Sequence, residues 1–394
     1  MSRLALVVLI LVWAPAQAAE PADSDVLARL AESGEQTELL FWSQEDRRVG
    51  FRNMPSLGPA RLIENGDSPF PLDSAPVDLA GVSYEVEGES FRLGDYLADP
   101  AHMGLIVVRG GEILFEDYSG GNSEESVWIS FSVTKSVTSM LIGAAIKDGF
   151  IESVDEPVVN YLPRLRGSGY EQANIRNVLN MASGVRWNED YADPASDVAN
   201  AGAANGVALA DYLSTLPVEA DPGEVFNYNT GETNLVGEIL RAAIGNNAAT
   251  YLTQKIWLPF GMEYDAWWSL GGDGGGELGG CCISATLRDY ARLGLFAMGG
   301  GRLRDGTPML PENWMADSTR PSKGFDGYGY LWWLFGDASY AARGIFGQLI
   351  RIYPDDGLVI AAHGNAEAAV ATEFHAHQQA AVEAIRDYLA ESSR

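Results

Sequence analysis

Cysteine and histidine are scarce in this 394-residue chain, and their scarcity excludes several classes of site. The two cysteines, Cys281 and Cys282, are adjacent, and neighbouring cysteines rarely bridge each other. We therefore expect no disulfide framework and assign both to buried packing beside Gly279 and Gly280. With only four histidines and no CxxC or HExxH motif, the chain is predicted to hold no metal and no cofactor.

Positive charge and long apolar runs are also lacking. The chain has 26 basic and 54 acidic residues and a formal net charge of −28, which argues against nucleic acid and anionic membranes as partners. The longest apolar run, Leu4 to Trp13, has ten residues and is too short for stable membrane insertion. It follows Arg3 and precedes Ala16-Gln17-Ala18, so residues 1–18 are predicted to be a signal peptide of a periplasmic or secreted protein. A buried N-terminal strand is the alternative interpretation.

A serine nucleophile with its own base is predicted at Ser132 and Lys135. Apolar residues recur at helical spacing after Ser132, and Gly149 matches a C-terminal stop, so residues 132–148 are predicted to form a helix. The two side chains then lie one turn apart on the same face. Burial disfavours the charged form of a lysine, so Lys135 can accept the serine proton near neutral pH. The alternative is a polar N-cap followed by a surface lysine, but the apolar helix around Lys135 favours catalysis.

Strand patterns occur near both ends of the C-terminal body, and helical patterns lie between them. Residues 104–108 and 112–115 flank a Gly-Gly turn, and residues 344–353 and 358–362 flank a Pro-Asp-Asp-Gly turn. The chain is therefore predicted to have an α/β fold, in which an antiparallel sheet built from both ends is flanked by helices. We expect a body at 101–394 with an inserted all-α subdomain at roughly 150–300, a long helix at 366–390, and a partly irregular leader at 19–100 that packs on the body. The cleft between sheet and helices is the expected site.

Two further segments carry candidate chemistry. Tyr228 follows a Pro-Gly turn and precedes a predicted helix, where its phenol can relay a proton, although a packed tyrosine is the alternative. Residues 341–348 resemble an edge strand, and Gly344 and Gly347 allow another chain segment or a substrate to approach closely. An amide there can face the amide of Ser132 and form an oxyanion hole, while a β-bulge is the alternative.

In order and spacing, these three segments resemble the serine β-lactamase and penicillin-binding-protein superfamily. The similarity is closest to class C β-lactamase-like esterases and to the 6-aminohexanoate-dimer hydrolase branch, and it extends over roughly residues 84–365. It implies a β-lactamase/transpeptidase-like sandwich. The matching segments are residues 128–136, 175–185, 187–191, 286–292 and 327–333.

The resemblance also implies a role for individual residues. Ser132 is the expected nucleophile, Lys135 its base and Tyr228 the proton relay, and the amides of Ser132 and Ile345 form the oxyanion hole. Tyr191 and Gly344 are expected to contact the substrate. Tryptophans are the candidates for an apolar lining of the cleft, with core packing as the alternative; they are Trp187, Trp267, Trp268, Trp332 and Trp333.

Two positions depart from the family pattern and bear on the substrate. Thr230 stands where the second segment usually has Asn or Ser, and Ala342 stands where the third usually has a lysine that holds a carboxylate. Strand alternation turns Arg343 away from the face of Ala342. We therefore predict an exported serine hydrolase that cleaves a small-molecule ester or linear amide through an acyl-enzyme. The alternatives are a true β-lactamase or D,D-peptidase, and a non-catalytic binding module that acylates without turnover. The sequence specifies no oligomeric state.

Overall fold

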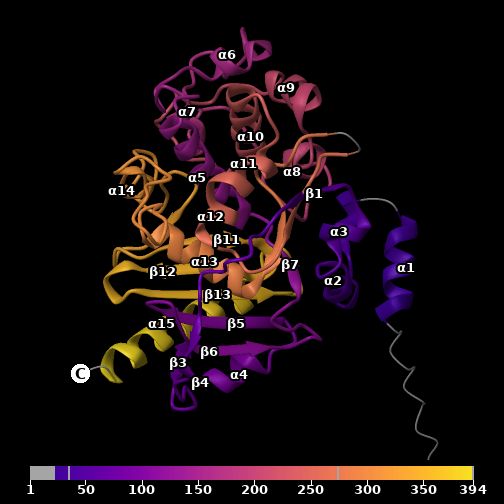
Figure 1. The fold of residues 1–394 in the computed structure, drawn as a ribbon. Helices are drawn as coiled ribbons and strands as arrows, with labels where there is room; N and C mark the ends of the chain where they lie inside the picture. The colour runs from indigo at the N-terminus through magenta and orange to yellow at the C-terminus, as the bar shows by residue number, and fades with distance from the viewer. Residues whose placement is uncertain (1–22, 34–35, 273–274, 393–394) are drawn as a thin grey trace, which may run out of the picture.

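The computed structural model describes residues 23–33, 36–272 and 275–392 (Figure 1). The predicted signal peptide, residues 1–18, lies outside the described residues. Within the described ranges, no helix combines the length and the apolar character needed to cross a bilayer.

Seven strands form the large sheet, in the order β10-β11-β12-β13-β5-β6-β2. Neighbouring strands are antiparallel except for β2 and β6. Strands from both ends of the body therefore lie side by side, which confirms the predicted α/β fold with a mainly antiparallel sheet. The strands are β2 (Asp73–Ser74), β5 (His102–Arg109), β6 (Glu112–Tyr118), β10 (Trp333–Leu334), β11 (Tyr340–Gly344), β12 (Gln348–Tyr353) and β13 (Leu358–Gly364).

The expected strand over residues 344–353 is interrupted by a turn. Residues Ile345–Gly347 reverse the chain, so that β11 and β12 form a hairpin in which Gly344 pairs with Gln348. Phe346 and Gly347 have φ values of 62° and 97°, and this left-handed backbone cannot continue a strand. The turn places Ile345 at the end of the sheet rather than within it.

Alternate residues of the central strands face two different helical layers. On β12, Ile350 belongs to the core shared with α5 (Val133–Lys147) and α13 (Leu287–Met298). Its neighbour Leu349 belongs to the core shared with α15 (Thr372–Ser392), the long C-terminal helix. The sheet is thus covered on both faces, as a buried strand pattern requires.

The helical part of the molecule lies above the sheet in Figure 1 and is built around α10, which packs on α5. Within residues 150–300, however, α13 packs on the large sheet, and two strands of a smaller sheet also fall in this range. The other helices of this range are α6 (Val158–Tyr161), α7 (Ile175–Leu179), α8 (Asp197–Ala201), α9 (Gly206–Ser214), α10 (Thr230–Ile244), α11 (Ala248–Leu252) and α12 (Leu258–Phe260). The short α14 (Trp314–Ser318) follows later in the chain.

A second sheet, in the order β1-β8-β9-β7, leads directly into the predicted site, because β7 is followed at once by α5. Residues before 101 supply β1 to this sheet and β2 to the large one, and Phe51 and Met54 pack against Trp128 of β7. The strands are β1 (Ala60–Ile63), β7 (Val127–Ile129), β8 (Ala266–Ser269) and β9 (Ile283–Thr286). The N-terminal segment also contains α1 (Asp23–Ser33), α2 (Gln44–Gly50), α3 (Met54–Leu57), α4 (Leu93–Leu97) and the hairpin β3 (Ser83–Val86) and β4 (Glu89–Arg92).

Candidate active site

Ser132 and Lys135 lie together at the N-terminus of α5, as the sequence spacing predicts. Ser132 is the N-cap residue, and Lys135 Nζ lies 3.0 Å from Ser132 Oγ. The helix ends at Asp148 and Gly149, and Gly149 has a φ of 80° that stops it. Ser132 is 8% exposed and Lys135 1% exposed, so the alternative of a surface lysine is wrong.

Three oxygen atoms surround the Lys135 amine. Besides Ser132 Oγ, Nζ lies 3.0 Å from Thr230 Oγ1 and 3.0 Å from the carbonyl oxygen of Gly280. Burial lowers the pKa of Lys135 to about 8, and the negative charge of Glu189 opposes this shift. A substantial fraction of Lys135 is therefore neutral near pH 8, as a general base for Ser132 requires.

Tyr228 lies close to Lys135 and is held by aromatic packing. Its ring stacks on Trp333 with centroids 5.5 Å apart, and Lys135 Nζ lies 5.3 Å from the Tyr228 ring centroid. Burial is the main cause that raises the pKa of Tyr228, and a hydrogen bond with Ser132 partly opposes it. The phenol therefore keeps its proton at neutral pH and is a possible donor to a leaving group.

Gly344 and Ile345 bring the end of β11 against the residues before the nucleophile. A Cβ atom on Gly344 would lie 2.5 Å from the carbonyl oxygen of Ser130, so only glycine permits this approach. Ile345 and Ser132 both line the cavity described next. The oxyanion hole formed by their two amides stays a prediction that this shared cavity wall is compatible with.

An apolar cavity of about 110 Å³ opens beside Ser132. Among the described residues that line it, Lys135 is the one charged side chain, and Tyr191 lies at its wall. The N-terminal segment contributes to the wall, which the sequence did not predict. The lining residues besides Ser132 and Ile345 include Leu39, Leu40, Met54, Ile129, Phe131, Val198, Ala199, Ala203, Leu278, Cys281 and Cys282.

Two expectations about the cavity are wrong. Cys281 and Cys282 were expected to be unbridged, but the structure joins them as a disulfide, with Cα atoms 3.2 Å apart. The five tryptophans proposed for the apolar lining do not belong to the described lining residues, because they pack elsewhere. Trp187, for example, is 5% exposed and packs against Gly231, while Trp333 supports Tyr228.

The third segment presents no cation to the cavity. Ala342 is 1% exposed and packs in the core with Ile350, its partner across β11 and β12. Arg343 lines a separate cavity of about 20 Å³ against α15, together with Arg351 and His375. The site therefore lacks a lysine or arginine at the usual carboxylate-binding position, as the sequence indicated.

Sequence reasoning missed two groups near the catalytic pair, one that reaches Lys135 through Thr230 and one that contacts Lys135 directly. The first is Glu189, which accepts hydrogen bonds from the Tyr191 hydroxyl at 2.6 Å and from the Thr230 amide at 3.0 Å. The second is the carbonyl of Gly280, which accepts from Lys135. Glu189 lies within the matching segment 187–191, but one carboxylate among 54 acidic residues is not a distinctive signal.

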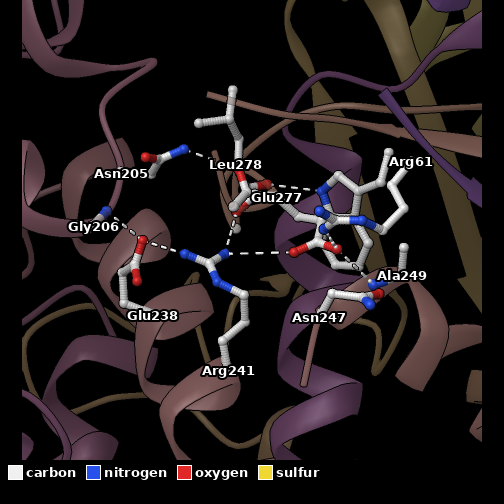
Figure 2. Close-up of polar contacts among 12 residues, drawn as sticks. Arg61, Asn205, Gly206, Glu238, Arg241, Asn247, Ala249, Glu277 and Leu278 are labelled. Atoms are coloured by element: carbon white, nitrogen blue, oxygen red, sulfur yellow. Dashed lines mark hydrogen bonds and ion pairs between the residues drawn. The ribbon is translucent and has the colours of Figure 1, made fainter. Parts of the chain in front are cut away.

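The segment that carries Gly280 is anchored by a buried ionic network (Figure 2). Glu277 is 1% exposed, forms an ion pair with Arg61 and lies 3.7 Å from Arg241. Arg241 also donates to the Glu277 carbonyl at 2.7 Å, and the Ala249 amide donates to the Glu277 carboxylate at 3.1 Å. These contacts from β1, α10 and α11 hold the chain three residues before Gly280, and so hold the carbonyl that faces Lys135.

No group of three or more histidine, cysteine, aspartate or glutamate side chains that could hold a metal ion occurs in the described part of the chain. The site at Ser132 brings together a serine hydroxyl, a buried amine and a phenol. These are groups that acyl transfer through a serine ester can use.

Comparison with known proteins gives a consistent picture. The sequence pattern of the family described as Beta-lactamase matches residues 98–384. The chain is 27% identical over 354 residues to a 6-aminohexanoate-dimer hydrolase from Paenarthrobacter ureafaciens, covering 84% of this chain and 88% of the relative.

Solved structures agree in fold. A protein assigned as a 6-aminohexanoate-dimer hydrolase from Bacillus anthracis has a TM-score of 0.78 and 22% identity, over 87% of this chain and 94% of that one. A family VIII carboxylesterase has a TM-score of 0.54 and 15% identity, over 74% of this chain and 95% of that one. At these identities, the two structures support the fold alone.

Proposed function

The chain belongs to the Beta-lactamase family and is a serine hydrolase of that fold, and we propose that it cleaves small neutral esters or linear amides through an acyl-enzyme on Ser132. The observation that carries this proposal is the buried Lys135 amine, 3.0 Å from Ser132 Oγ, at the wall of an apolar cavity. A buried amine without a carboxylate partner at ion-pair distance is costly to a fold, which supports a catalytic role.

In the proposed mechanism, Lys135 takes the Ser132 proton while Ser132 Oγ bonds to the substrate carbonyl carbon. The amides of Ser132 and Ile345 stabilise the resulting oxyanion. Tyr228 gives its proton to the departing alcohol or amine as the carbonyl–leaving group bond breaks, and it takes up in return the proton held by Lys135. In the second half, Lys135 takes a proton from water, and the water oxygen bonds to the acyl carbonyl carbon. The bond to Ser132 Oγ then breaks, Ser132 regains its proton, and the acid is released.

The cavity supports a preference for a neutral, apolar acyl group. Its described lining offers no charged partner other than Lys135, which the mechanism uses as the base. A substrate carboxylate or ammonium group in the cavity would lose hydration without gaining an ion pair. The 6-aminohexanoate-dimer named for the relative carries charged ends, so we propose that the substrate of this chain differs from it.

A substrate panel tests the proposal. Short p-nitrophenyl esters, a chromogenic cephalosporin and a linear amide are incubated with the wild-type protein and with Ser132→Ala. We expect ester turnover that is lost in Ser132→Ala, with a covalent acyl group on Ser132 detected by mass spectrometry. One acyl group per chain without turnover would identify a non-catalytic binding module, and preferred cephalosporin turnover would identify a β-lactamase or D,D-peptidase.

Export is part of the proposal. It is supported by Arg3 and the short apolar run before Ala16-Gln17-Ala18. N-terminal sequencing of native protein is expected to begin at or near Ala19. A native protein that still begins at Met1 would contradict export.

A further inference from the structure

Glu189 is the centre of a hydrogen-bond network that ends at the Lys135 amine. Its carboxylate accepts from four donors, which are the Trp187 indole, the Tyr191 hydroxyl, the Thr230 amide and the Thr230 hydroxyl. The indole and amide N–H groups can only donate, and they share one carboxylate oxygen, whereas the two hydroxyls share the other. A carboxylate, which only accepts hydrogen bonds, satisfies all four donors at once.

The Thr230 hydroxyl connects this carboxylate to the base. Its hydrogen is directed to Glu189, which is an acceptor alone when ionised. The same oxygen lies 3.0 Å from Lys135 Nζ and must therefore accept a hydrogen bond from the amine. The Gly280 carbonyl, also 3.0 Å from Nζ, is likewise an acceptor.

These directions determine where the lone pair of a neutral lysine points. A neutral amine has two N–H groups and one lone pair, and here Thr230 and Gly280 take the two N–H groups. The third neighbour at 3.0 Å is Ser132 Oγ, so the lone pair faces the serine proton. The base is oriented before any substrate binds, which is how a positioned general base becomes efficient.

We propose that Glu189 is a positioning residue, which orients the Lys135 lone pair toward Ser132 by keeping the Thr230 hydroxyl as an acceptor. This inference rests on the proposed function, since it assumes that Lys135 is the base for Ser132. A threonine hydroxyl can both donate and accept, so a fixed carboxylate is needed to select its direction.

Replacement of Glu189 by glutamine is expected to reverse the direction in which the Thr230 hydroxyl hydrogen points. The glutamine oxygen can still accept from the Trp187 indole and the Thr230 amide, which share one carboxylate oxygen in the wild-type protein. Its NH₂ group then faces the Thr230 hydroxyl, which must accept and turn its own hydrogen toward Lys135. The lone pair of the amine is then bonded to Thr230 instead of Ser132.

The other ionisable groups near the Lys135 amine must be considered before a pH profile is assigned to Lys135. Tyr228 and Tyr191 have pKa values raised by burial and by Glu189, so both stay neutral below pH 10. Burial lowers the pKa of Arg343, whose guanidinium lies over the Trp333 ring and in turn lowers the pKa of Tyr228. Glu232, on α10, has a pKa raised by burial to about 8, and Glu232→Gln therefore serves as a control for the pH profile.

The test is a double-mutant cycle of Glu189→Gln and Thr230→Val, with Glu116→Gln as the matched control. Glu116 is a partly buried, ion-paired carboxylate on β6 that does not line the cavity. The readouts are the rate at which a fluorophosphonate labels Ser132 and the ester kcat, each as a function of pH, with thermal unfolding to verify folding. The labelling rate requires no knowledge of the natural substrate.

We expect Glu189→Gln to lower both rates roughly 100-fold, within the range of a lost general base. The acid limb of its profile shifts to lower pH, because the charge that raised the Lys135 pKa is gone. In the Thr230→Val background, Glu189→Gln should lower the two rates by less than about threefold, because no hydroxyl remains to bond the lone pair of Lys135. Glu189→Asp, which keeps the charge, retains more activity than Glu189→Gln and also covers the case in which Glu189→Gln fails to fold.

Two results would overturn the inference in distinguishable ways. If wild-type Ser132 is labelled but the effects of the two substitutions on the labelling rate are additive, Glu189 does not act through Thr230. The positioning role is then wrong, while the proposed function is unaffected. A lowered melting temperature without a shift of the acid limb has the same meaning. If wild-type Ser132 is not labelled at all, the proposed function falls together with the inference.

Discussion

The rings of Phe131 and Phe346 pack together with centroids 5.3 Å apart, and both residues have a left-handed backbone, with φ values of 45° and 62°. Phe131 directly precedes Ser132, and Phe346 directly follows Ile345. The two residues that bracket the proposed oxyanion-hole amides are thus joined by their side chains. A bulky residue with a left-handed backbone conformation destabilises the folded state by roughly 1–3 kcal/mol. The packing around the two rings must therefore stabilise both conformations. Phe51, from the N-terminal segment, contacts both rings at 5.0 and 5.4 Å.

Loss of this packing is expected to reduce kcat more than it raises KM. Phe346→Ala removes a ring that is 0% exposed and lowers the free energy of unfolding by roughly 3–5 kcal/mol. Phe346→Leu, which preserves most of the volume, tests catalysis in a better-folded protein. Steady-state ester kinetics and thermal unfolding provide the measurement, and Phe150→Ala, at a side chain 47% exposed on the surface, is the control. An unchanged kcat in Phe346→Leu, with only reduced stability, would contradict a role in holding the amides.

Removal of the base is expected to nearly abolish acylation. Lys135→Ala should lower the rate of Ser132 labelling roughly 10²- to 10⁴-fold, the contribution of a general base. In the wild-type protein, the neutral amine is the active form, so kcat/KM should rise with pH through about 8 and then level off. Lys147→Ala, at the exposed end of the same helix, is the matched control and should behave as wild type. A pH profile that is flat between pH 6 and 10 would contradict Lys135 as the base.

The close approach of Gly344 to Ser130 predicts a sensitive position outside the reacting groups. In Gly344→Ala, the new Cβ would lie 2.5 Å from the Ser130 carbonyl oxygen, so the end of β11 must move and carry the Ile345 amide with it. Loss of one oxyanion-hole donor costs roughly 10²- to 10³-fold in kcat. Gly336→Ala is the control, because it lies in the exposed loop before β11, where a Cβ meets nothing within 4 Å. Equal kcat values for the two variants would count against Ile345 as an oxyanion donor.

Substrate preference should follow from the missing strand cation. Without a lysine at position 342, a substrate carboxylate loses a charge-assisted bond worth roughly 1.5–3 kcal/mol. This corresponds to about a 10- to 100-fold loss for carboxylate-bearing β-lactams and peptides. Neutral esters do not use that contact, so p-nitrophenyl butyrate should have a higher kcat/KM than any cephalosporin, with linear amides slower than esters. Faster cephalosporin hydrolysis would support the β-lactamase alternative.

Glu232 is expected to make stability depend on pH. Its carboxyl group is 1% exposed, and burial raises its pKa from 4.5 to about 8, although hydrogen bonds from Ser183 partly oppose this. Between these pKa values, the folded state binds more protons than the unfolded state, so this group lowers stability as pH rises. Urea unfolding of Glu232→Gln and wild type should therefore show a relative gain for the variant as pH rises from about 4.5 to about 8. Lys135 has the opposite effect on the pH dependence of stability, but it is present in both proteins and so cancels in the comparison. A difference in the free energy of unfolding that does not change with pH would contradict the raised pKa of Glu232.

Local patterns in the sequence were sufficient for the elements that carry the site. The period of an α-helix places Lys135 one turn after Ser132, and Gly149 ends that helix, whatever the rest of the chain does. The hairpin of β5 and β6 likewise follows from two strand patterns and a Gly-Gly turn. These predictions succeeded because each depends on residues that are near in sequence.

The tertiary structure alone decided which groups meet the catalytic pair. Thr230 is 95 positions from Lys135 in the sequence, and Gly280 is 145 positions away, yet both lie 3.0 Å from its amine. No helical or strand period relates such distant residues; their contact depends on how α5, α10 and the small sheet pack. The packing of Trp187 and Trp333 behind the site was unpredictable for the same reason. Sequence periodicity determines which face of an element is buried, whereas the partner of that face is determined by the free energy of the whole packed core.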